Sequence, residues 1–254
     1  MFLCIIQARM NSTRLRGKVM KKIDGKNPSL FYTISQLQSC KLIKKIIVAT
    51  TTKKEDDIIE KYSKKINIEC FRGSENDVLD RYYNCAKNSN FKNIIRITAD
   101  CPLIDPTLVD RMILEFKRNN YDYIHNFDPR TFPDGEDIEI FTMELLSKAW
   151  RYAKLPSERE HVTPYLRKNY KKFKIKNFAN KKDLSEYRLT VDYKEDLKLI
   201  KKIIKNIDKR PILIKDIIQF LQNKPELIKI NTKFEPNEGY AKSLEEDKKI
   251  LKNK

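Results

Sequence analysis

The chain has 254 residues, 53 of them Lys or Arg and 35 Asp or Glu, so its formal net charge is +18. Its 12 Phe and 12 Tyr, within a hydrophobic fraction of 40%, supply enough apolar surface for a core and exclude intrinsic disorder. Only 5 Gly and 10 Pro exclude a collagen-like or linker-like chain, while the positive charge first suggests a nucleic-acid partner.

No run of about 18 apolar residues is present, so the sequence predicts no membrane-spanning helix and no membrane partner. The apolar N-terminal stretch ends at Gln7 and lacks the charged start and small-residue cleavage site of a signal peptide. The 5 cysteines form no CxxC pair and indicate neither a zinc site nor a disulfide framework. We therefore expect a reduced, cytoplasmic protein.

Short apolar runs alternate with helical periodicity through the first half of the chain. Strands are expected at residues 2–6, 45–50, 69–71 and 93–98, and helices at 29–40, 54–65, 76–87 and 106–118. The last of these helices has Asp105 as its expected N-cap and Pro106 at its first position. Strands that alternate with helices predict the α/β class, with a parallel sheet covered on both faces.

The second half of the sequence is less regular. Strands are expected at 121–126, 137–141, 173–178 and 187–191, and helices at 143–154, 195–207 and 212–222. No internal repeat or low-complexity linker divides the chain, so we expect one domain over residues 1–241. The charged tail, residues 242–254, lacks an apolar stripe and is expected to fray.

A polar loop, residues 7–18, follows the first predicted strand directly. It contains three arginines and a lysine: Arg9, Arg14, Arg16 and Lys18. Ligands gather at the carboxyl ends of parallel strands, and guanidinium groups suit polyphosphate oxygens. A solvated basic loop is the alternative, but the buried strand that leads into it favours anion binding. The loop is not a P-loop, because Ser12 stands where that motif needs its first Gly.

Two aspartates follow predicted strands. Asp100 comes after the strand at 93–98, and a carboxylate beside a phosphate-binding loop suits Mg²⁺. A turn or cap residue is the alternative there, and Pro102 favours it. Asp192 follows the strand expected at 187–191, where, for this residue by itself, an N-cap for the next helix is the favoured interpretation. Each signal is weak by itself.

Several motifs occur in a defined order along the chain. They cover residues 5–18, 77–83, 96–106, 132–141, 159–165 and 188–192. Together they resemble the CTP-dependent sugar-acid cytidylyltransferases, most of all the branch called spore coat polysaccharide biosynthesis protein F, with CMP-Kdo and CMP-acylneuraminate synthetases as relatives. One departure is Arg16, which stands where the family loop usually has a proline and which either loosens the loop or adds a phosphate donor.

The resemblance implies a nucleotide-diphospho-sugar transferase-like fold, an α/β/α sandwich around a mainly parallel mixed sheet. It also implies attack of an acceptor oxygen on the α-phosphorus of CTP, with Mg²⁺ as the cofactor and pyrophosphate as the leaving group. The acceptor would be a nonulosonic-acid-like sugar acid or a phosphorylated small molecule, in the biosynthesis of surface polysaccharides or glycan precursors. Related synthetases are commonly dimers, so a homodimer is expected.

The same resemblance assigns roles to individual residues. It gives Arg9, Arg14 and Lys18 to the triphosphate, Ala8 and Ser12 to the nucleotide, Asp77 and Arg81 to the base or ribose, and Pro133, Asp137, Glu139, Arg159 and His161 to the acceptor pocket. Asp100 and Asp192 would share the metal, and Lys18, Arg14 and Asp100 would be catalytic. For His161, a helix-surface residue held by a salt bridge is the alternative.

Two other functions compete with this prediction. A glycosyltransferase on the same fold normally has an Asp-x-Asp metal motif after a strand, whereas this chain has Ala99-Asp100-Cys101. A nucleic-acid-binding protein would concentrate its charge on one face with exposed aromatics. Here 39 of the 53 basic residues are Lys, scattered at the ends of predicted elements. We therefore expect no nucleic-acid partner.

Overall fold

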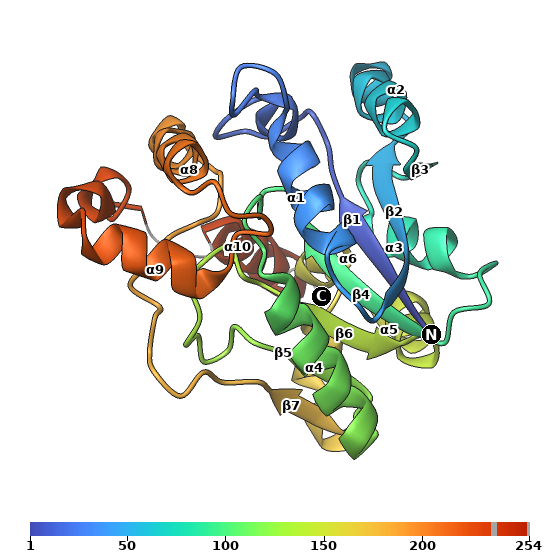
Figure 1. Ribbon diagram of the computed structural model, residues 1–254. Helices are drawn as coiled ribbons and strands as arrows, with labels where there is room; N and C mark the ends of the chain where they lie inside the picture. The colour runs from blue at the N-terminus through green and yellow to red at the C-terminus, as the bar shows by residue number, and fades with distance from the viewer. Residues whose placement is uncertain (235–237, 253–254) are drawn as a thin grey trace.

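The computed structural model describes residues 1–234 and 238–252. Within these ranges one sheet has the strand order β3-β2-β1-β4-β6-β5-β7 (Figure 1). Its strands are β1 (Phe2–Gln7), β2 (Ile43–Thr51), β3 (Glu69–Gly73), β4 (Asn93–Thr98), β5 (Tyr123–His125), β6 (Glu139–Thr142) and β7 (Ile175–Asn177). Only β6 runs antiparallel to its neighbours, so the predicted α/β class with a mainly parallel mixed sheet is confirmed.

Helices cover both faces of this sheet (Figure 1). They are α1 (Ser29–Gln38), α2 (Asp57–Lys65), α3 (Val78–Ala86), α4 (Pro106–Asn119), α5 (Met143–Tyr152), α6 (Pro156–His161), α7 (Pro164–Lys168), α8 (Lys194–Asn206), α9 (Ile214–Gln222) and α10 (Glu238–Lys252), with 3-10 turns at Lys18–Met20, Lys54–Asp56, Tyr170–Lys172 and Pro225–Ile230. Asp105 caps α4 as predicted, since its carboxylate accepts from the Thr107 amide at 2.7 Å. No helix in the described ranges is long and apolar enough to cross a membrane.

The core has two layers, one on each face of the sheet. Residues of β1 alternate between them: Cys4 and Ile6 contact the side of α1 and α4, and Leu3 and Ile5 contact the side of α3 and α5. Because both faces are covered, β1 is a continuous apolar run rather than an alternating one. A third apolar cluster joins α8 and α9 to the rest of the chain and supports the segment that leads to Asp192.

The strand expected at 187–191 is wrong. This segment is extended but makes only an isolated bridge, Asp134 to Arg188, among the described residues. Its amides bond to loops instead of a neighbouring strand: Leu189 and Thr190 donate to the Asp134 carbonyl at 2.6 and 3.0 Å, and Val191 donates to the Asp100 carbonyl at 2.8 Å. These bonds fix the position of the residues that follow.

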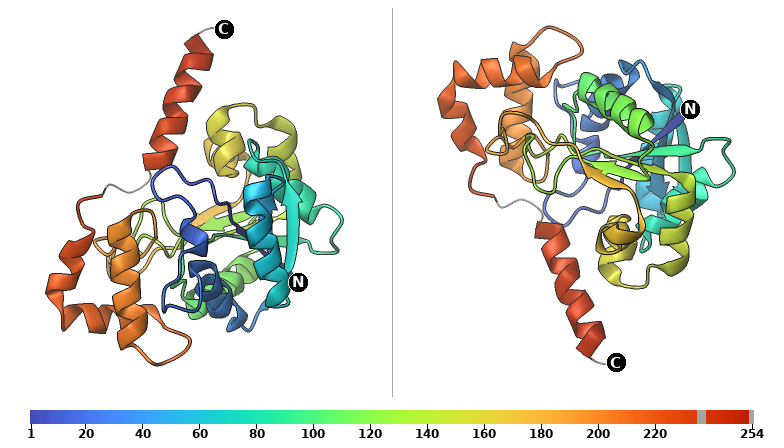
Figure 2. Two further views of the ribbon diagram at one scale, coloured as in Figure 1. Left: turned by 90° about the horizontal axis from the view of Figure 1, so that it is seen from above. Right: turned by 90° about the horizontal axis from the view of Figure 1, so that it is seen from below.

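The frayed tail expected at 242–254 is also wrong for the part that the structure describes, because the proposed boundary at 242 lies inside α10. Figure 2 shows α10 extending away from the sheet, with its N-terminal end against the body of the protein. A polar anchor explains the order without an apolar stripe: buried Asp247 accepts from the amide and hydroxyl of Ser157, at 2.9 and 2.5 Å. Residues 253–254 lie outside the described ranges.

The contact between Gly135 and the 187–191 segment gives a stability prediction. Gly135 has φ +106°, and a Cβ there would lie 2.5 Å from the Thr190 nitrogen. Gly135→Ala should therefore lower the free energy of unfolding by about 2–4 kcal/mol in urea titrations. Gly25→Ala is the matched control, since Gly25 has φ +82° but open space around it, and should cost about 1 kcal/mol. Equal losses in the two variants would contradict the close approach.

Candidate active site

Hydrogen bonds from two backbone amides hold the loop after β1 in a closed form. The Gly17 amide donates to the Met10 carbonyl at 2.8 Å, and the Met10 amide donates to the Asp56 carboxylate at 2.6 Å. Gly17 adopts φ +67°, which turns the chain directly into the 3-10 turn that starts at Lys18. The loop thereby holds Lys18 at the carboxyl end of the sheet.

Lys18 brings together the two aspartates that the sequence could not connect. Its Nζ lies 2.6 Å from Asp100 Oδ2 and 2.7 Å from Asp192 Oδ1. Burial raises the pKa of Asp100, but the adjacent Lys18 ammonium more than offsets this and holds that pKa at about 2. Burial lowers the pKa of Lys18, and the two carboxylates raise it above its ordinary value. Asp100 and Lys18 are therefore both charged near neutral pH.

The other loop arginines that were assigned to the triphosphate also have carboxylate partners. Arg14 lies 2.7 Å from Asp192 Oδ1 and 3.2 Å from Glu238 Oε2, and Arg9 lies 2.9 Å from Glu160 Oε1. Glu238 was not anticipated, because it begins α10, a helix that the sequence analysis did not predict and that none of its motifs covers. These carboxylates hold the cations where anionic oxygens would bind.

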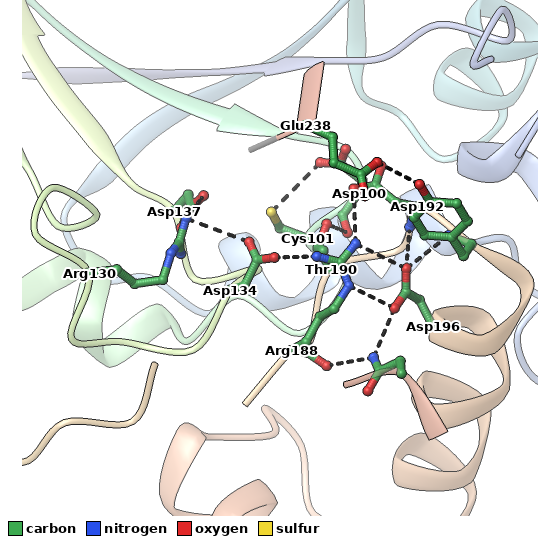
Figure 3. Close-up of polar contacts among 12 residues, drawn as sticks. Asp100, Cys101, Arg130, Asp134, Asp137, Arg188, Thr190, Asp192, Asp196 and Glu238 are labelled. Atoms are coloured by element: carbon green, nitrogen blue, oxygen red, sulfur yellow. Dashed lines mark hydrogen bonds and ion pairs between the residues drawn. The ribbon is translucent and has the colours of Figure 1, made fainter. Parts of the chain in front are cut away.

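Arg188 fixes the second oxygen of Asp192 (Figure 3). Its Nη2 donates to Asp192 Oδ2 at 3.2 Å, its Nη1 to Asp134 Oδ2 at 2.5 Å, and its Nε to Asp196 Oδ1 at 3.0 Å. Fully buried Asp196 also accepts from the Asp192 amide at 2.9 Å. The sequence signal for this network was the spacing of four residues from Arg188 to Asp192 and from Asp192 to Asp196, which we did not use.

Two cavities meet at this cluster. The first chamber, about 710 Å³, is lined by Lys18, Asp100 and most of the loop after β1. The second chamber, about 350 Å³, is lined by Asp100, Asp192 and residues of the 127–139 and 161–167 segments. Arg14, Arg96, Thr98, Asp100, His161, Glu238 and Gly239 line both. The aspartates and Lys18 thus lie where the two chambers join.

The residues assigned to the nucleotide lie mostly in the first chamber. Ala8, Arg9, Ser12, Arg14, Lys18 and Arg81 line it. Arg81 is only 1% exposed and donates to the Ser74 carbonyl at 2.8 Å; burial lowers its pKa. Asp77 lines neither chamber: it caps α3 and pairs with Arg159, and its assignment to the base or ribose stays a prediction.

The residues assigned to the acceptor pocket divide differently. Asp137, Glu139 and His161 line the second chamber, whereas Arg159 lines the first. Pro133 is buried and lines neither chamber, and its contact with the acceptor stays a prediction. Spacing alone could not separate these residues, since all of them lie within the same two sequence motifs.

Glu139 acts mainly as a support for the second chamber. Its carboxylate pairs with Arg96 and accepts from the hydroxyls of Tyr123 and Thr163, each at 2.5 Å. Burial raises the pKa of Glu139, but the Arg96 guanidinium and the hydrogen bonds from Thr163 and Tyr123 together outweigh burial and leave the pKa below its usual value. With all these partners, Glu139 is an ordered anion that fixes Arg96 and Thr163.

A tight turn places His161 and Thr163 in the second chamber. Val162 adopts φ +70° and ψ −51°, and the Thr163 amide donates to the His161 carbonyl at 2.8 Å. This is the strained form of the γ-turn, which a β-branched residue adopts only under constraint. His161 Nε2 lies 3.1 Å from Ser243 Oγ, so it is not the salt-bridged surface residue of the alternative interpretation.

Arg16 lies outside both chambers. Its side chain is 80% exposed, lies 3.6 Å from Glu55 and lines neither chamber. The loop keeps its closed form without the family's proline, because the Met10 and Gly17 backbone bonds hold it.

The mainly parallel sheet, with a basic loop and paired carboxylates at its carboxyl end, defines a nucleotidyltransferase fold and site. A family model described as Cytidylyltransferase matches residues 3–232. The chain belongs to this family.

Individual relatives agree with this family. The chain is 40% identical over 206 residues to an uncharacterized protein of Methanocaldococcus jannaschii, covering 80% of this chain and 83% of that protein. It is 34% identical over 216 residues to the spore coat polysaccharide biosynthesis protein SpsF of Bacillus subtilis, covering 82% and 88%. A solved cytidylyltransferase from Leptospira borgpetersenii superimposes with a TM-score of 0.86 at 39% identity, covering 89% and 96%.

Two buried histidines predict how stability depends on pH. Burial lowers the pKa of His125 and of His161 from 6.5 to about 4, so the unfolded chain takes up these protons at higher pH than the folded chain. The free energy of unfolding should therefore fall as the pH drops from about 6.5 to 4. Asp134, whose pKa burial raises from 3.8 to about 6, acts in the opposite direction over part of this range.

A variant isolates the share of one histidine. His125→Phe keeps an aromatic ring beside Tyr123 and Phe127. Over that pH range its free energy of unfolding, measured in urea, should fall by about 1–3 kcal/mol less than that of the parent. Asp134 contributes equally to both proteins and cancels. Identical pH profiles for the two proteins would contradict the lowered pKa of His125.

Proposed function

We propose that this protein transfers CMP from CTP to a sugar acid or a phosphorylated small acceptor and releases pyrophosphate. The observation that carries the proposal is the position of Lys18, Asp100 and Asp192 at the junction of two chambers. A transferase with two substrates needs such a junction, because the reacting atoms must meet beside the groups that neutralise their charge. The expected homodimer and cytoplasmic location stay predictions.

The first chamber suits a nucleoside triphosphate. Its volume of about 710 Å³ lies within the usual range for ligand pockets. Arg9, Arg14 and Lys18 would exchange their carboxylate partners for phosphate oxygens, to which guanidinium and ammonium groups give charge-assisted hydrogen bonds. The choice of CTP among the nucleoside triphosphates rests on the family description, Cytidylyltransferase.

The donor set also fits the proposed Mg²⁺. Oxygens of Asp100 and Asp192 converge on one cation position, the Lys18 Nζ. No cluster of three or more His, Cys, Asp or Glu suited to a metal occurs in the described ranges, so phosphate oxygens and water would complete the shell, as is usual for Mg²⁺. When bound, Mg²⁺ would supply neutralisation of charge on the α-phosphate.

The remaining work falls to the side chains of the chain itself. An acceptor oxygen from the second chamber forms a bond to the α-phosphorus, and the bond from that phosphorus to the bridging oxygen breaks, with the electron pair leaving on pyrophosphate. A hydroxyl acceptor releases its proton to water as the new bond forms, whereas a phosphate acceptor attacks through an oxygen that carries no proton. Lys18, Arg9 and Arg14 line the side to which pyrophosphate departs and would stabilise its charge. Arg188 keeps Asp192 oriented throughout.

Removing a metal carboxylate tests the proposal. Asp100→Asn should lower pyrophosphate release from CTP plus acceptor by at least about 100-fold, because a preorganised charge is lost from the reacting centre. The assay uses each of the four nucleoside triphosphates with a panel of sugar acids and sugar phosphates. Asp208→Asn, at an exposed loop position, is the matched control and should retain full activity. Near-normal turnover by Asp100→Asn would overturn the proposal, as would turnover of all four nucleotides at equal rates.

Two neighbouring loop arginines should behave differently. Arg14→Ala removes a cation that lines both chambers and should raise the KM for CTP by about 10- to 100-fold. Arg16→Ala removes an exposed side chain and should leave that KM within about twofold. Steady-state kinetics with CTP as the varied substrate measure both, and a large effect of Arg16→Ala would show that the loop closes differently around nucleotide.

A further inference from the structure

We propose that Arg167 is the residue of the second chamber that binds the anionic group of the acceptor, whether a carboxylate or a phosphate. This inference rests on the proposed transferase function and identifies a specificity-determining residue within it. Arg167 lies in α7 and lines the second chamber but not the first.

Arg167 differs from the other arginines of this chamber in its ion pairs. Arg96 is paired with buried Glu139, and Arg14 with Asp192 and Glu238. Within the described ranges, the ion pair of Arg167 is a contact of 3.2 Å to Asp128, whose side chain is 63% exposed. Exposed ion pairs contribute little free energy, so an incoming anion can replace Asp128 at small cost.

The guanidinium also has donor capacity to spare. Its Nε is buried and has no hydrogen-bond partner among the described residues. A buried donor without a partner is costly, so the protein's own groups leave part of this guanidinium unsatisfied. Carboxylate and phosphate oxygens match the fork of a guanidinium, which offers parallel donors.

Two aromatic rings hold the guanidinium in place. Its central carbon lies 5.4 Å from the ring centroid of Phe127 and 5.3 Å from that of Tyr240. Cation–π contacts of this length stabilise the charge without occupying its N–H groups. Tyr240 belongs to α10, the helix that projects in Figure 2, and lies beyond residue 232, where the family match ends.

Other side chains of the chamber would repel an anion. Asp134 and Asp137 also line it; Arg130 pairs with both, and Arg188 pairs with Asp134 (Figure 3). A cation in a lining that also holds carboxylates orients an anionic ligand. Thr163, Thr190 and His161 are neutral polar groups of the same lining.

Direct binding tests the inference without turnover. The enzyme is first saturated with Mg²⁺ and the α,β-methylene analogue of CTP, and calorimetry then follows N-acetylneuraminate, 3-deoxy-manno-octulosonate and glycerol 3-phosphate as probes. Arg167→Gln should weaken the tightest probe by about 10- to 100-fold, and Arg167→Lys by less. Asp128→Asn should tighten it severalfold, because the competing carboxylate is gone. Which probe binds distinguishes a carboxylate from a phosphate.

Controls separate this inference from the proposed function. Arg151→Gln, an exposed Arg on α5, should bind both the analogue and the probe as the parent does. Arg167→Gln should keep the parent's affinity for the CTP analogue, and with a productive acceptor should raise the acceptor KM more than it lowers kcat. Failure of the analogue to bind the parent would overturn the proposed function. Binding of the analogue with no probe bound, or with a probe insensitive to Arg167→Gln, would overturn the role of Arg167 alone.

Discussion

The Lys18 ammonium lies between the carboxylates of Asp100 and Asp192. These two residues are 82 and 174 positions farther along the chain than Lys18. Removing three such charges from water is costly, and each is tolerated only because the others are present. The loop after β1, the end of β4 and the segment before α8 must therefore reach their places together. The rest of the site depends on this contact, because it fixes where the two chambers join.

Charges of alternating sign continue outward from that centre. Asp192 is held by Lys18 and Arg14 through one oxygen and by Arg188 through the other, and Arg188 continues to Asp134 (Figure 3). The same ion network thus reaches from the first chamber to the second chamber. Its hydrogen bonds define the direction of each carboxylate, which matters more for catalysis than their net stabilisation.

Helix α10 adds a wall that the core does not require. Asp247 anchors it on α6, and its first turn brings Glu238 and Tyr240 to the chambers. It contributes to the surroundings of Arg14 and Arg167 from outside the segment that the family match covers. The lining of the second chamber therefore depends in part on a helix that lies outside the matched segment.

The sequence by itself determined the α/β class, most element positions, the basic loop at the end of β1 and Asp100 at the end of β4. These features depend on short-range apolar periodicity and on the rule that loops at strand ends carry the site. Only the tertiary structure decided that residues 187–191 bond to loops, that Pro133 and Asp77 lie off the chambers, and that Arg167 lines the second chamber. Hydrogen-bond and charge partners far apart in the sequence depend on the path of the folded backbone, which local patterns do not encode.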